Sequence, residues 1–148
     1  MTNNQNDPSK LDSQYRAMLI LWIAFLPTIV IYLFLSFVLP RPAVPPDRML
    51  TITFNVMSVC LVAVSFVLKR RLLSRSIEAQ DVRLVNKAFI VAAALCEAGA
   101  LLGLLDFLVA RDRYYFVLIA FSFFGLLLHF PRRSQLEAAS FKSTHTLN

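Results

Sequence analysis

The chain has 148 residues, a formal net charge of +6, and 57% hydrophobic residues against 16% charged ones. A soluble domain of this length does not need so large an apolar share, so the composition excludes an ordinary soluble globular protein. Most apolar residues lie in four long runs, which leaves no room for a separate soluble domain.

The four runs predict an all-α, polytopic membrane protein with four transmembrane helices. A hydrocarbon core of about 30 Å requires roughly 20 apolar residues in a helix, and the last run, of roughly 17 residues, is at the lower limit. The runs do not alternate between apolar and polar residues as the strands of a barrel would. The predicted organisation is a cytoplasmic tail at 1–16, a transmembrane domain at 17–130 with helices at 17–39, 49–68, 88–110 and 114–130, and a cytoplasmic tail at 131–148.

The first helix, at 17–39, is predicted to remain in the protein as an uncleaved anchor. It is too long for the apolar part of a signal peptide, and no small-x-small cleavage motif follows it. Most of both tails, at 1–13 and 134–148, is predicted to be disordered, with a brief extension of the fourth helix over 132–139.

The second and fourth helices carry polar side chains inside their apolar runs. These are Asn55 and Ser58 in the second helix and Ser122 and His129 in the fourth. The Asn55 amide is expected to hydrogen-bond to another helix, with a stabilisation of about 0.6–2 kcal/mol. His129 lies at the end of its run, next to Pro131, so we expect it at the membrane interface.

A basic segment at 69–87 separates the second and third helices. With four crossings it shares one side of the membrane with both tails, and that side carries eleven lysines and arginines against four on the other. The positive-inside rule then places both termini in the cytoplasm. The segment is predicted to continue the flanking helices or to form a short interfacial one. Four of its cations are expected on anionic lipid headgroups, at about 1 kcal/mol each: Lys69, Arg70, Arg71 and Arg75. Because orientation and lipid contact account for the charge, no nucleic-acid partner is expected.

Glu97 lies at the middle of the third helix, and the other three runs have no charge at their centres. A carboxyl group at that depth is costly, so it usually marks a function or a partner that offsets the cost. Three polar side chains of other helices are candidate partners: Asn55, Ser58 and Ser122. A second carboxyl group, Asp106, is nearer the end of the helix and is expected to pair with Arg111 or Arg113.

Small residues form a stripe along the third helix when each residue advances by about 100°. The stripe comprises Ala88, Ala92, Cys96, Gly99, Gly103, Asp106 and Ala110. Small side chains let two helix backbones approach closely, so the stripe is predicted to pack tightly on another helix. The packing site proper is expected at Ala92, Cys96, Gly99 and Gly103, and Glu97 points almost the opposite way.

The segment Ala94-Leu-Cys-Glu-Ala-Gly-Ala-Leu-Leu-Gly-Leu-Leu105 resembles the carboxylate-bearing helix of the ATP synthase rotor subunit c, which reads Leu-x-Glu-Ala followed by glycine and aliphatic residues. The resemblance implies that Glu97 binds and releases a proton or a sodium ion. The basic segment before the helix also fits the hairpin plan of that family, whereas the second helix here has no glycine. The chain is also similar to small four-helix bacterial membrane proteins that carry such a Glu-containing helix.

Two functions are therefore expected. The first is a non-catalytic helix bundle that acts by association, as a homo-oligomer or as an accessory subunit of a membrane complex. The alternative is proton or cation handling through Glu97.

No enzyme is expected, because the chain has no His-Glu-x-x-His, Gly-x-Ser-x-Gly or Cys-x-x-Cys motif. Its two cysteines, Cys60 and Cys96, lack metal-ligand spacing, so no metal or cofactor is expected. The expected location is the cell membrane, as a multi-pass protein of a bacterial inner membrane.

Overall fold

All regular structure in the described part of the chain is helical, which confirms the predicted all-α class. The computed structural model describes residues 8–40, 45, 47–79 and 81–140. Its elements are α1 (Pro8–Val38), α2 (Arg48–Ala79), α3 (Val82–Leu105), the π-helical turn η1 (Asp106–Ala110), α4 (Tyr115–Leu128) and α5 (Arg133–Ser140).

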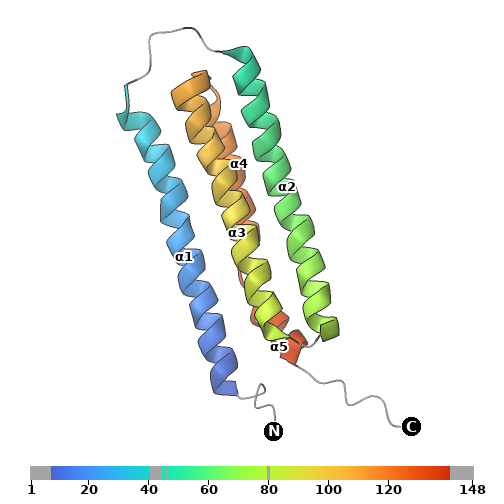
Figure 1. Cartoon of the computed structure of the whole chain (residues 1–148). Coiled ribbons are helices and arrows are strands. Elements are labelled where there is room, and N and C mark those ends of the chain that lie inside the picture. Colours follow the sequence, from blue (N-terminus) through green and yellow to red (C-terminus); the bar gives the residue numbers. More distant parts are fainter. Residues whose placement is uncertain (1–7, 41–44, 46, 80, 141–148) are drawn as a thin grey trace, which may run out of the picture.

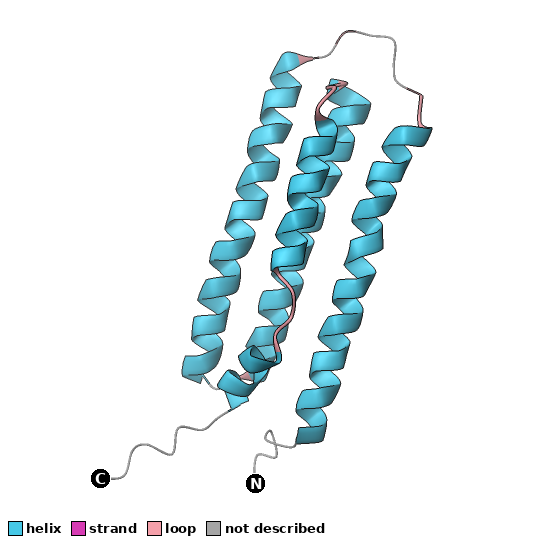
Figure 2. Ribbon diagram, turned by 180° about the vertical axis from the view of Figure 1, so that it is seen from behind, coloured by secondary structure: helices cyan, strands magenta, loops and turns pink. Residues whose placement is uncertain are grey.

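The long helices run alternately up and down in one bundle (Figures 1 and 2). One end of the bundle contains the beginning of α1, the end of α2 and the whole of α5. It also carries the arginines of the segment 69–87, and we call it the basic end. The turn at 111–114, between η1 and α4, lies at the opposite end, called the loop end. Arg111 begins this turn in the left-handed conformation, with φ 62°.

Three segments are long and apolar enough to cross a membrane: Leu11–Val38, Arg48–Ala79 and Val82–Ala110. The fourth predicted span is different. α4 has 14 residues, about 21 Å at 1.5 Å per residue, and it passes the same test only together with α5, to which it is bent by 48°. The chain is therefore a helical membrane protein with three candidate spans, or four if α4 and α5 form one broken span.

Several predicted boundaries are wrong because helices continue beyond the apolar runs. α1 begins at Pro8, so residues 8–16, predicted as tail, are helical. A proline suits the first turn of a helix, where the missing N–H would have no helical partner. α2 likewise continues to Ala79, and α3 begins at Val82, where the Asp81 side chain accepts the N–H of Arg83 at 2.9 Å. The basic segment thus continues both flanking helices, which is one of the two forms that the sequence predicted for it.

The predicted extension of the fourth helix at 132–139 is a separate short helix, α5. It lies against the beginning of α1, where Asp12 accepts from Arg16 at 3.2 Å and from Arg133 at 3.4 Å. These side chains are largely exposed, so each ion pair contributes at most about 1 kcal/mol. The remaining parts of the predicted tails, 1–7 and 141–148, lie outside the described residues.

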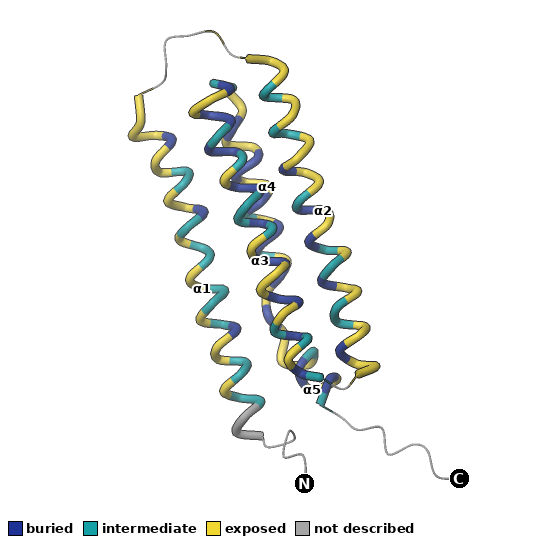
Figure 3. The backbone as a smooth tube through the Cα atoms, viewed as in Figure 1, coloured by how far each residue is buried: buried dark blue, intermediate teal, exposed yellow. Residues whose placement is uncertain are grey.

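α3 is the central helix of the bundle, and it packs most extensively on α2 and α4 and less on α1 (Figure 3). Every residue of the small-residue stripe is buried. In contrast, the outward faces of α1, α2 and α4 expose large apolar side chains, such as Phe34, Val56 and Phe124. A soluble protein rarely exposes so much apolar surface, so this surface suits contact with lipid.

Candidate functional site

Polar side chains inside the bundle gather in two places. One is the contact between α1 and α3 that contains Glu97. The other lies near the basic end, where α4 ends, and joins Ser65 and Lys69 of α2, Cys96 of α3 and His129. We call these four residues the α4-end cluster.

Glu97 is half-buried on the α1 side of α3. The Tyr32 hydroxyl group donates to its Oε1 at 3.4 Å, which is long for a hydrogen bond between oxygens. Among the described residues no lysine or arginine forms an ion pair with it. The carboxyl group is therefore held by one weak neutral donor from another helix.

The three predicted partners of Glu97 are wrong. Asn55 donates to the Thr51 carbonyl on its own helix at 2.8 Å. Ser58 donates to the Gly99 carbonyl at 3.0 Å, within the small-residue stripe. The Ser122 hydroxyl is buried and has no hydrogen-bond partner among the residues described. Asn55 and Ser58 lie on α2 and Ser122 lies on α4, the two helices that pack most extensively on α3. Glu97 faces α1 instead.

Asp106 does not pair with Arg111 or Arg113 through its side chain, contrary to the prediction. Asp106 is fully buried at the start of η1, and the described ion pairs include neither arginine. The contact between Asp106 and Arg111 is made by the backbone: the Arg111 N–H donates to the Asp106 carbonyl at 2.6 Å. The widened π-helical turn thus brings the two residues together by their main chains.

Ser65 is the centre of the α4-end cluster. Its hydroxyl group donates to the Val62 carbonyl at 2.6 Å, and its oxygen lies 2.8 Å from His129 Nε2 and 3.6 Å from Cys96 Sγ. Ser65 and His129 share a hydrogen bond whose donor depends on the tautomer of the histidine ring. The ring also lies against Phe66, with ring centroids 4.4 Å apart.

Two side chains from other helices satisfy carbonyl groups at the end of α4. Lys69 Nζ donates to the His129 carbonyl at 3.1 Å, and Trp22 Nε1 of α1 donates to the Leu126 carbonyl at 3.1 Å. The last carbonyls of a helix have no partner within it and carry partial negative charge, so a lysine there is favourable. The α4-end cluster therefore ties α2 and α3 to the end of α4, and Trp22 ties α1 to it.

Two predictions for this region are wrong. Lys69 is buried, with 9% of its surface exposed, and does not reach out to lipid headgroups as expected. His129 is 1% exposed and lies inside the bundle, not at the interface. The other predicted headgroup contacts, Arg70, Arg71 and Arg75, are exposed on α2, as such contacts require.

The chemistry open to the α4-end cluster is limited by its hydrogen bonds. A serine nucleophile needs a base that accepts its proton, whereas the Ser65 hydroxyl group donates to the Val62 carbonyl of its own helix. Both residues are also buried from any substrate. Elsewhere in the described ranges, no group of three or more His, Cys, Asp or Glu residues is placed to hold a metal ion.

Sequence reasoning did not single out Tyr32, Trp22 or Ser65, although each makes a contact between helices. Their partners are 65, 104 and 64 residues away along the chain. Helical periodicity indicates which residues share a face, but not which helix that face meets. The one available signal was that each of these side chains carries a hydroxyl or N–H group within an apolar run.

Comparison with known proteins finds no family model that matches this chain, and no curated protein or solved structure that is similar to it.

Proposed function

We propose that this chain is a membrane protein of four crossings, with both termini in the cytoplasm, that acts by helix–helix association and not by catalysis. The distribution of charge supports the orientation. The arginines of the segment 69–87, the beginning of α1 and the end of α5 all lie at the basic end. Ser65 and His129 are the residues that most resemble a catalytic pair, and their hydrogen bonds within the bundle support a structural role for them.

The small-residue stripe of α3 is occupied within the chain, so association needs another face. Gly99 and Gly103 lie against α2 and α4 of the same bundle, with neighbours such as Ser122 and Ile119 in contact range of an added Cβ. The stripe therefore holds this protein together and leaves the outer faces of the helices free for a partner.

The observation that carries the proposal is the outward face of α2. Six of its exposed residues recur in steps of four and three, next to other exposed residues such as Ile52 and Val64: Met49, Thr53, Val56, Cys60, Ala63 and Val67. This is the spacing of the contact line between two helices in a left-handed coiled coil. Thr53, Cys60 and Ala63 are also small enough to let backbones approach closely in lipid. We call these six residues the α2 seam.

A second copy of the chain fits the α2 seam, because copies inserted in the same orientation can pair seam to seam about a twofold axis. Cys60 then meets Cys60 of the second copy near the middle of α2. We expect a lipid-soluble oxidant such as copper phenanthroline to cross-link the wild type and the Cys96→Ala variant into dimers, and to leave Cys60→Ala monomeric. Cys96 is buried, so it does not compete.

Off-seam cysteines provide the matched control for this cross-linking. In the Cys60→Ala background, Val56→Cys and Val67→Cys restore the seam contact, whereas Val59→Cys exposes a thiol at similar depth on a neighbouring face. A disulfide needs Cα atoms about 4.4–6.8 Å apart, so we expect dimers from the first two variants and little from the third. Equal cross-linking at all positions, or none at any of them, would contradict association through the seam.

A second candidate function is proton or cation handling through Glu97, as the resemblance of its segment to subunit c also implies. The observation in its favour is that this carboxyl group lies near the middle of the span Val82–Ala110 without an ion-pair partner among the described residues. Such a group is available to take up a proton or a cation.

The Glu97→Gln variant separates the two functions. The amide oxygen of glutamine still accepts from Tyr32, so we expect unfolding free energy within about 0.6 kcal/mol of the wild type and unchanged Cys60 cross-linking. Flux of protons or sodium ions into reconstituted vesicles is the second measurement. Flux that is present in the wild type and abolished in the variant would favour ion handling, and equal flux in both would reject it.

A further inference from the structure

Asp106 is a carboxyl group buried inside the bundle near the loop end, and its side chain is left without a partner. The residue is 0% exposed. Among the described residues, neither of its carboxylate oxygens has a hydrogen-bond partner, and no lysine or arginine forms an ion pair with it. An isolated carboxylate is very costly to bury, so a group in such a place tends to take up a proton instead.

The π-helical turn η1 holds Asp106 between the loop end and α2. The Arg111 N–H donates to the Asp106 carbonyl at 2.6 Å, and the Asp47 N–H, just before α2, donates to the Ala110 carbonyl at 3.0 Å. η1 also packs on α2, where the Thr51 hydroxyl group lies beside the Asp106 carboxyl group. Single π-helical turns are frequent at functional sites, and this one begins at the buried carboxyl group.

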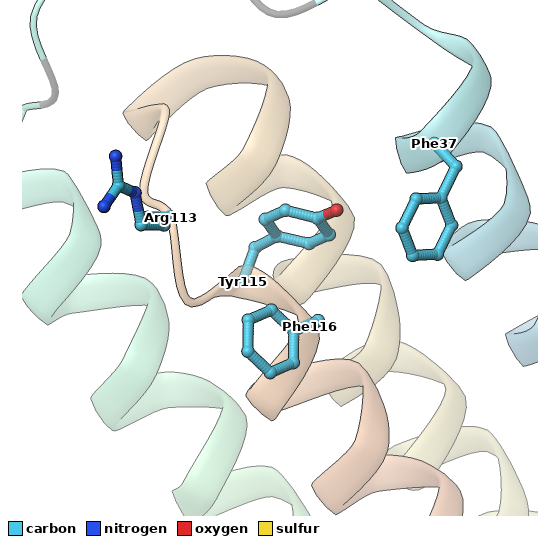
Figure 4. A pocket seen from close by; sticks show the side chains of 4 residues that line it. All are labelled: Phe37, Arg113, Tyr115 and Phe116. Carbon is cyan, nitrogen blue, oxygen red and sulfur yellow. The ribbon is translucent and has the colours of Figure 1, made fainter.

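The charged groups at this end come from the turn at 111–114 and from the start of α2: Arg111, Asp112, Arg113, Asp47 and Arg48. Asp112 is half-buried, and its carboxylate is close enough to repel a negative charge on Asp106. Figure 4 shows the Arg113 guanidinium group directed toward α2 and away from α1. Arg111 lies on the same turn, with its Nε buried and without a hydrogen-bond partner in the described part of the chain. The carboxyl group thus has a negative neighbour and a cation that it does not contact.

We propose that Asp106 is a proton-binding site that holds η1 on α2, with the protonated carboxyl group donating a hydrogen bond to the Thr51 hydroxyl group. The neutral acid has one O–H donor and remaining acceptor capacity, so it suits a single hydroxyl partner. The binding step moves one proton from water at the loop end to a carboxylate oxygen. The ionised form has no donor for Thr51 and is repelled by Asp112. It is attracted to Arg111, which belongs to the turn, so loss of the proton loosens the contact between η1 and α2.

Infrared spectroscopy of the full chain in phosphatidylcholine vesicles tests this proposal, because only a protonated carboxyl group has a carboxylic acid C=O stretching band. On acidification from mildly alkaline to mildly acidic pH, we expect the wild type to gain such a band that Asp106→Asn does not gain. Asp112→Asn is the matched control, since Asp112 is a half-buried carboxyl group of the adjoining turn, and it should keep the band. The full wild-type band in Asp106→Asn, or the same loss in both variants, would overturn the proposal.

A second pair of variants leaves both carboxyl groups in place, and it carries the test if Asp106→Asn is not helical by circular dichroism. Thr51→Val removes the proposed acceptor, so the band assigned to Asp106 should shift in frequency. Thr53→Val is its control, because Thr53 is exposed and its hydroxyl group donates to the Met49 carbonyl of its own helix at 2.9 Å. A band that is unshifted in Thr51→Val would rule out the contact with α2.

The pH dependence of stability gives an independent measurement. With a neutral Asp106, the folded chain binds one proton more than the unfolded chain until the pH falls to about 3.9, the ordinary value for aspartate. The unfolding midpoint of the wild type in mixed micelles should therefore rise as the pH falls toward that value. Asp106→Asn should lose this part of the pH dependence, and Asp112→Asn should retain it. A dependence in Asp106→Asn as steep as that of the wild type would contradict a proton on Asp106.

Discussion

Replacement of Gly103 by leucine is expected to destabilise the bundle by about 3 kcal/mol, the upper part of the range for an overpacked core. A Cβ atom at this position would lie 2.8 Å from Ile119 Cγ1, 3.1 Å from Leu118 Cβ and 3.2 Å from the Ile119 backbone nitrogen. A side chain could rotate away, but the backbone of α4 cannot. The larger residue must therefore push α4 from α3, and the unfolding midpoint in mixed micelles of sodium dodecyl sulfate should fall, as followed by circular dichroism.

Ala94→Leu is the matched control, because Ala94 is exposed on the same helix. It adds a similar volume outside the core, so we expect an unfolding free energy within about 0.5 kcal/mol of the wild type. Gly103→Ala should fall between the two. A midpoint unchanged by Gly103→Leu would show that α3 and α4 are not in close contact at this residue, and the central packing of the bundle would have to be revised.

Replacement of His129 by alanine is expected to cost about 3 kcal/mol, although no sequence motif marks this residue. The change removes the hydrogen bond to Ser65, the ring contact with Phe66, and the side-chain volume at a site that is 1% exposed. A lost buried hydrogen bond costs about 1 kcal/mol, and a cavity of this kind adds the larger part. The measurement is again the unfolding midpoint in mixed micelles.

His129→Phe separates the two contributions. The aromatic ring keeps its packing on Phe66 but has no nitrogen that can hydrogen-bond to Ser65, so we expect a loss of about 1 kcal/mol. Ser65 would still donate to the Val62 carbonyl, which limits the cost. If His129→Phe were as unstable as His129→Ala, the hydrogen bond and not the packing would dominate. If His129→Ala matched the wild type, the α4-end cluster would not hold the bundle together.

The helical class and the membrane setting could be predicted because they depend on composition and on long apolar runs. The burial of the α3 stripe also agrees with its helical periodicity, since Gly99 and Gly103 recur on one face of α3. Boundaries were less predictable. Apolar runs end where the hydrocarbon ends, but Pro8 and Ala79 lie in polar sequence that still has good helix formers.

The candidate site was harder to predict, because each of its contacts joins distant parts of the chain. Lys69 was counted among the headgroup cations on the strength of its basic neighbours. It is buried because the end of α4 offers it a carbonyl group, 60 residues away in the sequence. The predicted partners of Glu97 were chosen because they are polar. Its actual neighbour, Tyr32, is there because α1 packs on the face of α3 that carries Glu97. Sequence periodicity does not contain that information.

The length of α2 has a consequence for where its basic residues lie. α2 has 32 residues, about 48 Å at 1.5 Å per residue, against a hydrocarbon core of about 30 Å. At the basic end α5 packs on α2 and also contacts α1. We expect the surplus length of α2 to extend beyond the hydrocarbon core at this end, where it would hold Arg70, Arg71 and Arg75 in water.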